Sequence, residues 1–172
     1  DNFTVRKPET VKVPFTDEQQ HLHDELLRIQ AEVFSQIHDG LNVMFMMTTI
    51  RRQAASCLFG LAPFLEDILN RHIDELTWVE ADDTNEPEET AILPIQSQIN
   101  DLLDAARSLS PNDPKLETLR AILRNKQDLA NNKVMLFSSF RHTLSYLYTH
   151  LKADGFRVGL IHGGTPDEER VS

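Results

Sequence analysis

Residues 133–140 read KVMLFSSF, and the spacing of apolar side chains changes at this point of the chain. Residues 134–137 form a continuous apolar run, which is typical of a parallel β-strand buried on both faces. Helical spacing follows at Leu144, Leu147, Tyr148 and Leu151, and Asp154-Gly155 is expected to end that helix. Residues 156–161 predict a second strand, and a capping box at 165–168 starts another helix. This order predicts a βαβ unit, the opening of a parallel α/β domain.

The residues before this unit predict helices. A short strand is expected at 11–15, and Thr16 and Gln19 then have the spacing of a capping box. The first helix should end at Gly40, a second should begin near Asn42, and a third near Pro63. The expected inward-facing residues are Leu22, Leu26, Ile29, Val33 and Ile37; Met47, Ile50, Ala54, Leu58 and Leu61; and Leu65, Ile68, Leu69 and Leu76. This part of the chain is predicted to be a helical hairpin with one more helix.

Two more helices are predicted before the βαβ unit. Pro94 opens the first, and Asp113 caps the second, with Pro114 at its first position. Their apolar stripes are Ile99, Leu102, Leu103 and Ala106, and then Leu116, Leu119 and Leu123. The fold class is therefore predicted as mostly α with a partial α/β unit.

The net charge of −10 is unevenly distributed along the chain. Residues 72–106 carry ten acidic side chains and no Lys or Arg, whereas residues 107–172 carry ten basic against seven acidic side chains. The C-terminal third is thus the part suited to face phosphate. The acidic stretch at 78–93 predicts a mobile linker, with an acidic tail that binds a partner as the alternative.

Composition excludes several other classes of protein. The longest apolar run, 43–47, is far too short to cross a bilayer, and the first ten residues are unlike a signal peptide. Cys57 is the only cysteine, so neither an intrachain disulfide nor a cysteine-based zinc site is possible, and we expect it to be buried. His21 and His23 do not share a helix face, and we expect no metal site there. The chain lacks a starting Met and stops just after a helix-start signal, which predicts a piece of a longer protein. The single cysteine fits a reducing compartment, so we expect that protein to be cytoplasmic in a bacterium or otherwise intracellular.

Residues 133–170 resemble the start of the second RecA-like lobe of superfamily 2 helicases, most of all the Swi/Snf-type double-stranded DNA translocases. Residues 133–140 resemble motif IV of that family, although Ser139 replaces its usual Gln. Residues 161–170 resemble the next block, although His162 stands where relatives carry Asp or an apolar residue. Upstream, residues 50–56 resemble the Arg-rich helix between the lobes, particularly in the bacterial RNA-polymerase-associated branch.

The resemblance implies four parts. They are the exit strand of the first lobe (1–15), a helical interlobe region (16–78), an acidic flexible linker (79–93) and an incomplete C-terminal helicase lobe (94–172). The parent protein would bind ATP and Mg²⁺ and act on nucleic acid, in particular double-stranded DNA. This chain has neither a Gly-x-x-x-x-Gly-Lys-[Ser/Thr] loop nor an acidic Asp-Glu box after a strand. We therefore expect no catalytic residue here and no ATP hydrolysis by the chain alone.

Four groups of residues are candidate phosphate contacts. Ser138 and Ser139 follow the first predicted strand, where hydroxyls and amides can bind phosphate oxygens; a turn that caps the next helix is the alternative. Arg141 begins that helix, with simple solvent exposure as the alternative. Gly163, Gly164 and Thr165 lead into a helix N-terminus, with a plain tight turn as the alternative. Arg51 and Arg52 would reach phosphate or an acidic partner in the other lobe, with an ion pair to the acidic middle as the alternative.

Two other functions stay open. One is a non-enzymatic helical module that binds a protein partner through Met44, Phe45 and Met47. The other is an RNA helicase of related lineage. Lys115 is expected to be solvated or to help orient the lobe.

Overall fold

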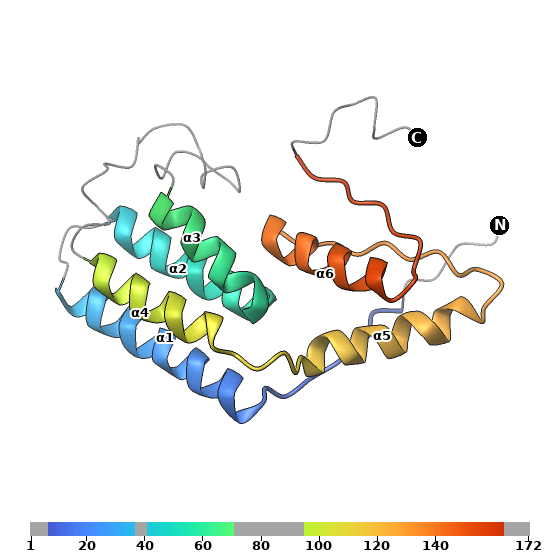
Figure 1. Ribbon diagram of the computed structural model, residues 1–172, viewed down its shortest axis with the longest axis horizontal. Coiled ribbons are helices and arrows are strands. Elements are labelled where there is room, and N and C mark those ends of the chain that lie inside the picture. The colour runs from blue at the N-terminus through green and yellow to red at the C-terminus, as the bar shows by residue number, and fades with distance from the viewer. Residues whose placement is uncertain (1–6, 37–40, 71–94, 164–172) are drawn as a thin grey trace.

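The computed structural model describes residues 7–36, 41–70 and 95–163 (Figure 1). This part of the chain is mostly helical and contains no β-strand. Its elements are α1 (Asp17–Gln36), α2 (Leu41–Ser56), the 3-10 helix η1 (Leu58–Gly60), α3 (Leu61–Asn70), α4 (Gln96–Arg107), α5 (Pro114–Gln127) and α6 (Arg141–Ala153). None of these helices is both long enough and apolar enough to cross a membrane. The predicted acidic linker lies outside the described residues.

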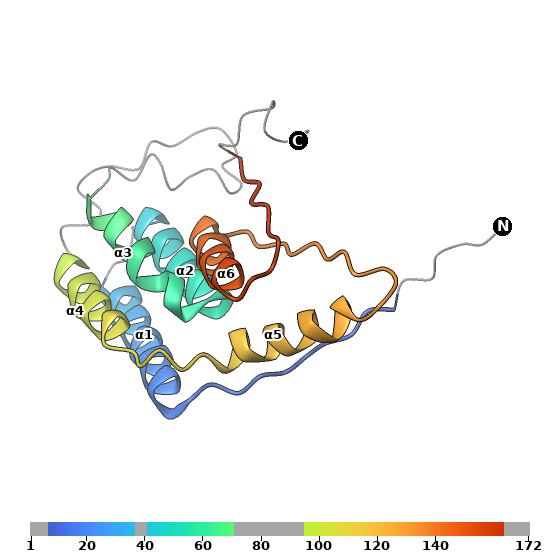
Figure 2. The same ribbon diagram turned by 45° about the vertical axis from the view of Figure 1, so that its right-hand side comes forward.

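Helices α1 to α4 form a four-helix bundle (Figures 1 and 2). Helix α1 lies against α2 and α4, and α3 lies against α2 and α4. The predicted apolar stripes converge on one core, which consists of Leu22, Leu26, Ile29, Val33, Val43, Met46, Met47, Ile50, Ala54, Leu58, Leu61, Phe64, Leu65, Ile68, Ile95, Ile99, Leu102, Leu103 and Ala106. The expected core positions Ile37 and Leu76 lie outside the described residues.

The start of α1 is the predicted capping box. The backbone N–H of Gln19 donates to the Thr16 hydroxyl, and the backbone N–H of Thr16 donates to the Gln19 side-chain carbonyl, both at 3.2 Å. Each residue thus satisfies an N–H that the helix itself leaves unpaired. This prediction is confirmed.

The second predicted helix differs from the structure, because it breaks before Leu58. Cys57 adopts an extended backbone with φ −157° and ψ 114°, and η1 separates α2 from α3. In one continuous helix, the ring of Pro63 would clash with the carbonyl of Phe59, four residues earlier. With the break, Pro63 falls in the first turn of α3, where that carbonyl is not in its way. Cys57 is buried as expected, and burial raises the pKa of its thiol to about 11.

Helix α5 begins and α6 ends as predicted. The Asp113 carboxylate accepts from the backbone N–H groups of Lys115 and Leu116 at 2.9 and 3.1 Å, and Pro114 follows it. After α6, Gly155 has φ +86° and its N–H donates to the carbonyl of Lys152. The N–H of Phe156 donates to the carbonyl of Leu151, which completes a Schellman motif.

The predicted strands are not formed. Residues 11–15, 134–137 and 156–161 are all irregular in the structure. The expectation that 134–137 is buried on both faces is also wrong, because Met135 is 77% and Phe137 is 85% exposed. A strand exists only when a neighbouring strand satisfies its backbone N–H and C=O groups, and the described residues supply no such neighbour.

Residues 108–113 connect the bundle to α5. The Gln19 amide donates to the carbonyl of Asn112 at 3.0 Å, and the N–H of Ser110 donates to the carboxylate of Glu18 at 3.1 Å. On the other side of this turn, the Tyr146 hydroxyl donates to the Asp113 carboxylate at 2.9 Å. Burial, reinforced by this hydrogen bond, raises the pKa of Tyr146.

Candidate nucleic-acid interface

Ser138 lies in the turn that leads into α6. Its hydroxyl accepts from the backbone N–H of Phe140 at 3.1 Å and lies 3.3 Å from the hydroxyl of Ser56 at the end of α2. This hydrogen bond forms a serine turn before α6, but no side chain caps the helix itself. Ser139, the next residue, is exposed. Of the two serines, Ser139 is the one whose side chain faces solvent.

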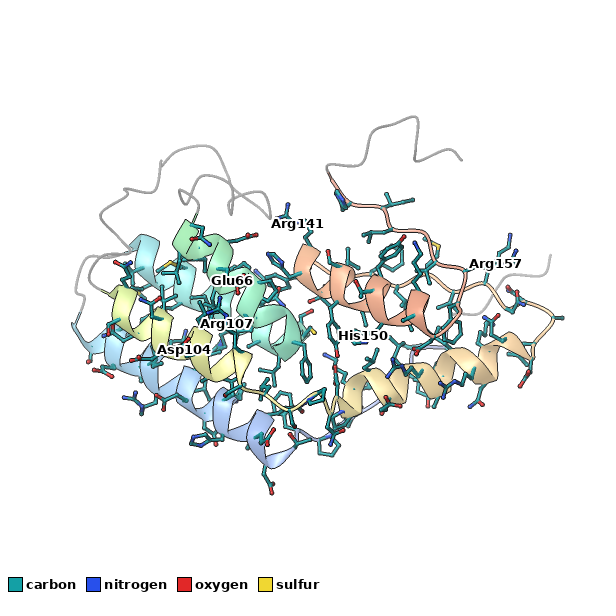
Figure 3. The ribbon with its side chains drawn as sticks, viewed as in Figure 1. Glu66, Asp104, Arg107, Arg141, His150 and Arg157 are labelled. Carbon is teal, nitrogen blue, oxygen red and sulfur yellow. The ribbon has the colours of Figure 1, made fainter. Side chains whose placement is uncertain are left out.

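Arg141 begins α6 and reaches back to the bundle. Its guanidinium Nη2 lies 3.1 Å from Oδ2 of Asp67 on α3, and Nε2 of His142 lies 3.0 Å from the same oxygen. Figure 3 shows Arg141 at the end of α6 that adjoins the bundle. The Arg141 side chain is 41% exposed. It is therefore ion-paired and also accessible to solvent, rather than simply solvated.

Behind this ion pair lies a small polar cluster. The hydroxyls of Ser56 and Thr143 are 3.0 Å apart, and the Gln53 amide donates to Thr143 at 3.3 Å and to the carbonyl of Cys57 at 3.1 Å. A Cβ atom added at Gly60 would come within 2.6 Å of the Gln53 amide nitrogen. Only glycine thus allows η1 to approach this close to Gln53.

Aromatic contacts complete the junction between the bundle and α6. The ring of Phe64 meets Phe140 and His142 edge-on, with centroids 6.3 and 5.8 Å apart. Phe59 stacks on Tyr146 with centroids 5.4 Å apart. Lys115 donates to the carbonyls of Ala55 and Ser56 at 3.2 and 2.6 Å, which places a cation at the C-terminus of α2. This fits the expectation that Lys115 orients the second half of the chain.

The other candidate residues are not part of this junction. Arg51 and Arg52 are exposed on α2, and neither makes an ion pair with any residue that the structure describes. Gly163 is exposed at the end of the segment that runs back past α6 in Figures 1 and 2. Gly164 and Thr165 lie outside the described residues. Ser138 and Arg141 thus contact the bundle, and the phosphate contacts of all these residues stay predictions.

The sequence did not reveal the bundle residues that contact the edge formed by Ser138, Ser139 and the start of α6 at Arg141. Asp67, Ser56 and Gln53 lie on α2 and α3, more than 70 residues before the side chains that they contact. Polar residues at these positions are ordinary on helices, so one sequence carries no signal for such pairs. Only the packing of α6 on the bundle reveals them.

The three residues proposed to bind a protein partner differ in their exposure to solvent. Met44 and Phe45 are 42% and 53% exposed, whereas Met47 is 1% exposed and belongs to the bundle core. A partner therefore cannot contact Met47 while the bundle is closed. That part of the expectation is wrong.

Comparison with known proteins gives a limited likeness. No protein-family model and no solved structure matches the chain. The ATP-dependent RNA helicase RhlB of Shewanella frigidimarina is 27% identical over 103 residues, which are 60% of this chain and 22% of that protein. The same protein of Shewanella sediminis is 28% identical with the same coverage.

The matched region thus spans about a fifth of the length of these relatives. The likeness supports the resemblance to superfamily 2 helicases. It favours the RNA-helicase alternative over the Swi/Snf-type DNA translocase.

Proposed function

We propose that this chain is a part of an ATP-dependent helicase and that its nucleic-acid substrate is RNA. The observation that carries this proposal is the 103-residue similarity to helicases named for RNA. The resemblance of residues 133–170 to motif IV and the block after it points to the same class of protein. The double-stranded DNA substrate has support from the resemblance alone, so RNA is the better proposal.

In this proposal the apolar segment 134–137, which is irregular and exposed in the structure, becomes a strand when the rest of a RecA-like lobe supplies a neighbouring strand. Met135 and Phe137 expose most of their surface, which is unusual for large apolar side chains and is typical of a surface that other elements cover. The turn at Ser138 and Ser139 and the start of α6 at Arg141 then lie at the end of this strand. Hydroxyl and guanidinium groups there bind the phosphate backbone and read no bases.

We expect ATP and Mg²⁺ to bind to other parts of the parent protein. The sequence contains no phosphate loop of the Gly-Lys-[Ser/Thr] kind. The described residues contain no group of three or more His, Cys, Asp or Glu side chains that could hold a metal ion. We place nucleotide binding in the parent protein and expect the chain alone to release no phosphate from ATP, even at saturating RNA.

The proposal is tested by RNA binding of the full chain. We expect an unstructured, fluorescently labelled RNA to bind at low salt and to dissociate as salt rises, because each phosphate contact releases counterions. The substitution Arg141→Gln should weaken binding of all RNA sequences alike. It should also reduce the slope of log affinity against log salt concentration by about one unit, the value for one phosphate contact. Fluorescence anisotropy measures both quantities.

Arg28→Gln is the matched control, because it removes the same charge from α1, where Arg28 pairs with Glu25 and Glu32. A duplex DNA of the same length decides between the two nucleic acids. Equal weakening by Arg28→Gln and Arg141→Gln would show that only overall charge matters. Absence of salt-dependent binding to either nucleic acid would reject the proposal.

A further inference from the structure

The carboxylate of Asp67 lies within ion-pair distance of two side chains in the first turn of α6. Arg141 and His142 both approach its Oδ2 atom, at 3.1 and 3.0 Å. Asp67 belongs to α3 of the bundle, whereas Arg141 belongs to the edge that we propose for phosphate contact (Figure 3). A carboxylate on a guanidinium occupies the kind of position that a phosphate group would take. The bundle thus presents an internal anion to that edge.

A second contact joins the same two parts of the chain. Ser56, the last residue of α2, places its hydroxyl 3.3 Å from that of Ser138. Two of the three residues with groups suited to phosphate, Ser138 and Arg141, therefore both contact the bundle. Ser139 lies between them in sequence and is exposed.

These contacts are weak enough to open. The Asp67 side chain is 23% and the Arg141 side chain 41% exposed, and partly exposed ion pairs contribute little net stability. The junction has the properties of a contact that can separate.

We propose that Asp67 and Ser56 form a latch that holds Arg141 and Ser138 against the bundle, so that the bundle and a phosphate backbone compete for these two side chains. The inference rests on the proposed function, because it assumes that this edge meets nucleic acid. Separation of α6 from the α2–α3 side of the bundle releases both side chains together. The latch therefore couples the position of the bundle to nucleic-acid affinity.

The test is the affinity of the full chain for an unstructured RNA at low salt. Asp67→Asn keeps the shape of the side chain and removes the competing charge. We expect it to tighten RNA binding about two- to fivefold, the range that loss of one partly exposed ion pair allows. The gain should disappear in the double variant Asp67→Asn with Arg141→Gln.

Glu66→Gln is the matched control on the same helix. Glu66 pairs with Arg107 of α4 at 2.8 Å, so this change removes one negative charge without touching α6. We expect its affinity to equal that of the unaltered chain. Ser56→Ala provides a second way to open the latch if Asp67→Asn unfolds, and thermal unfolding followed by circular dichroism monitors this.

The outcomes separate the latch from the proposed function. A gain in Asp67→Asn that is absent in Glu66→Gln and depends on Arg141 supports the latch. Equal gains in both variants, or no gain in Asp67→Asn and Ser56→Ala while Arg141→Gln still weakens binding, overturn the latch and leave the proposed function intact. If Arg141→Gln changes nothing in either background, the phosphate contact itself is wrong, and the latch with it.

Discussion

Among the residues that the structure describes, the bundle of α1 to α4 buries nineteen apolar side chains in one cluster, whereas α5 and α6 fully bury only Leu116, Leu123 and Leu151. The two halves are therefore stabilised differently. Burial of apolar surface is the dominant favourable term in the bundle. The second half relies more on individual hydrogen bonds, ion pairs and ring contacts, and it leaves Met135 and Phe137 exposed. We infer that the bundle is the stable element and that the α5–α6 half needs further cover.

The largest effect is expected from a cavity in the bundle core. Leu65 on α3 is fully buried, so Leu65→Ala should lower the free energy of unfolding by about 3 kcal/mol, from lost burial and the cavity left behind. Leu147 on α6 is only half-buried, and Leu147→Ala should lower it clearly less. Urea denaturation measures both values. Equal losses would remove the distinction between the halves.

A smaller effect is expected at the turn that connects the halves. Asp113→Ala removes the N-cap of α5 and the acceptor of the Tyr146 hydroxyl, which should cost about 2 kcal/mol in total. Tyr146→Phe removes only the second contact and separates the two contributions. Thermal unfolding should show the loss in the α5–α6 half first. If Asp113→Ala left the unfolding temperature unchanged, the polar links would not hold that half in place.

The smallest effect is expected at the end of α6. Gly155 has φ +86°, a conformation that costs about 1 kcal/mol for a residue with a Cβ atom. No atom lies within 4 Å of a Cβ added there, so Gly155→Ala tests backbone conformation alone. Gly159→Ala is the control, because its added Cβ also meets open space and its φ is not positive. Similar losses at both positions would contradict the role of the Schellman turn.

The predictions that succeeded depend on residues close together in sequence. Thr16 and Gln19 stand three positions apart, and Asp113 caps the helix that begins at the next residue. Such spacings specify a complete set of hydrogen bonds, so a sequence is enough to find them. The apolar stripes of the bundle were found for the same reason, because helical periodicity already places those residues on one face.

The predictions that failed depend on a distant partner. The apolar run 134–137 suits a buried strand, but strand formation requires a neighbour for its backbone and cover for its side chains, and the described chain provides neither. The break at Cys57 is an exception, because its signal is local: it follows from Pro63, although the apolar pattern continues through the break.

The candidate phosphate contacts could be named from the sequence, because hydroxyl and guanidinium groups after an apolar run suit that chemistry. Their partners in the bundle could not be named in this way. Arg141 pairs with Asp67 and Ser138 with Ser56, and 74 and 82 residues separate these partners in the sequence. Local spacing specifies helices, caps and inward faces through interactions within a few residues. The docking of α6 on the bundle is decided by shape and charge across the whole fold, and it is this packing that brings Asp67 to Arg141.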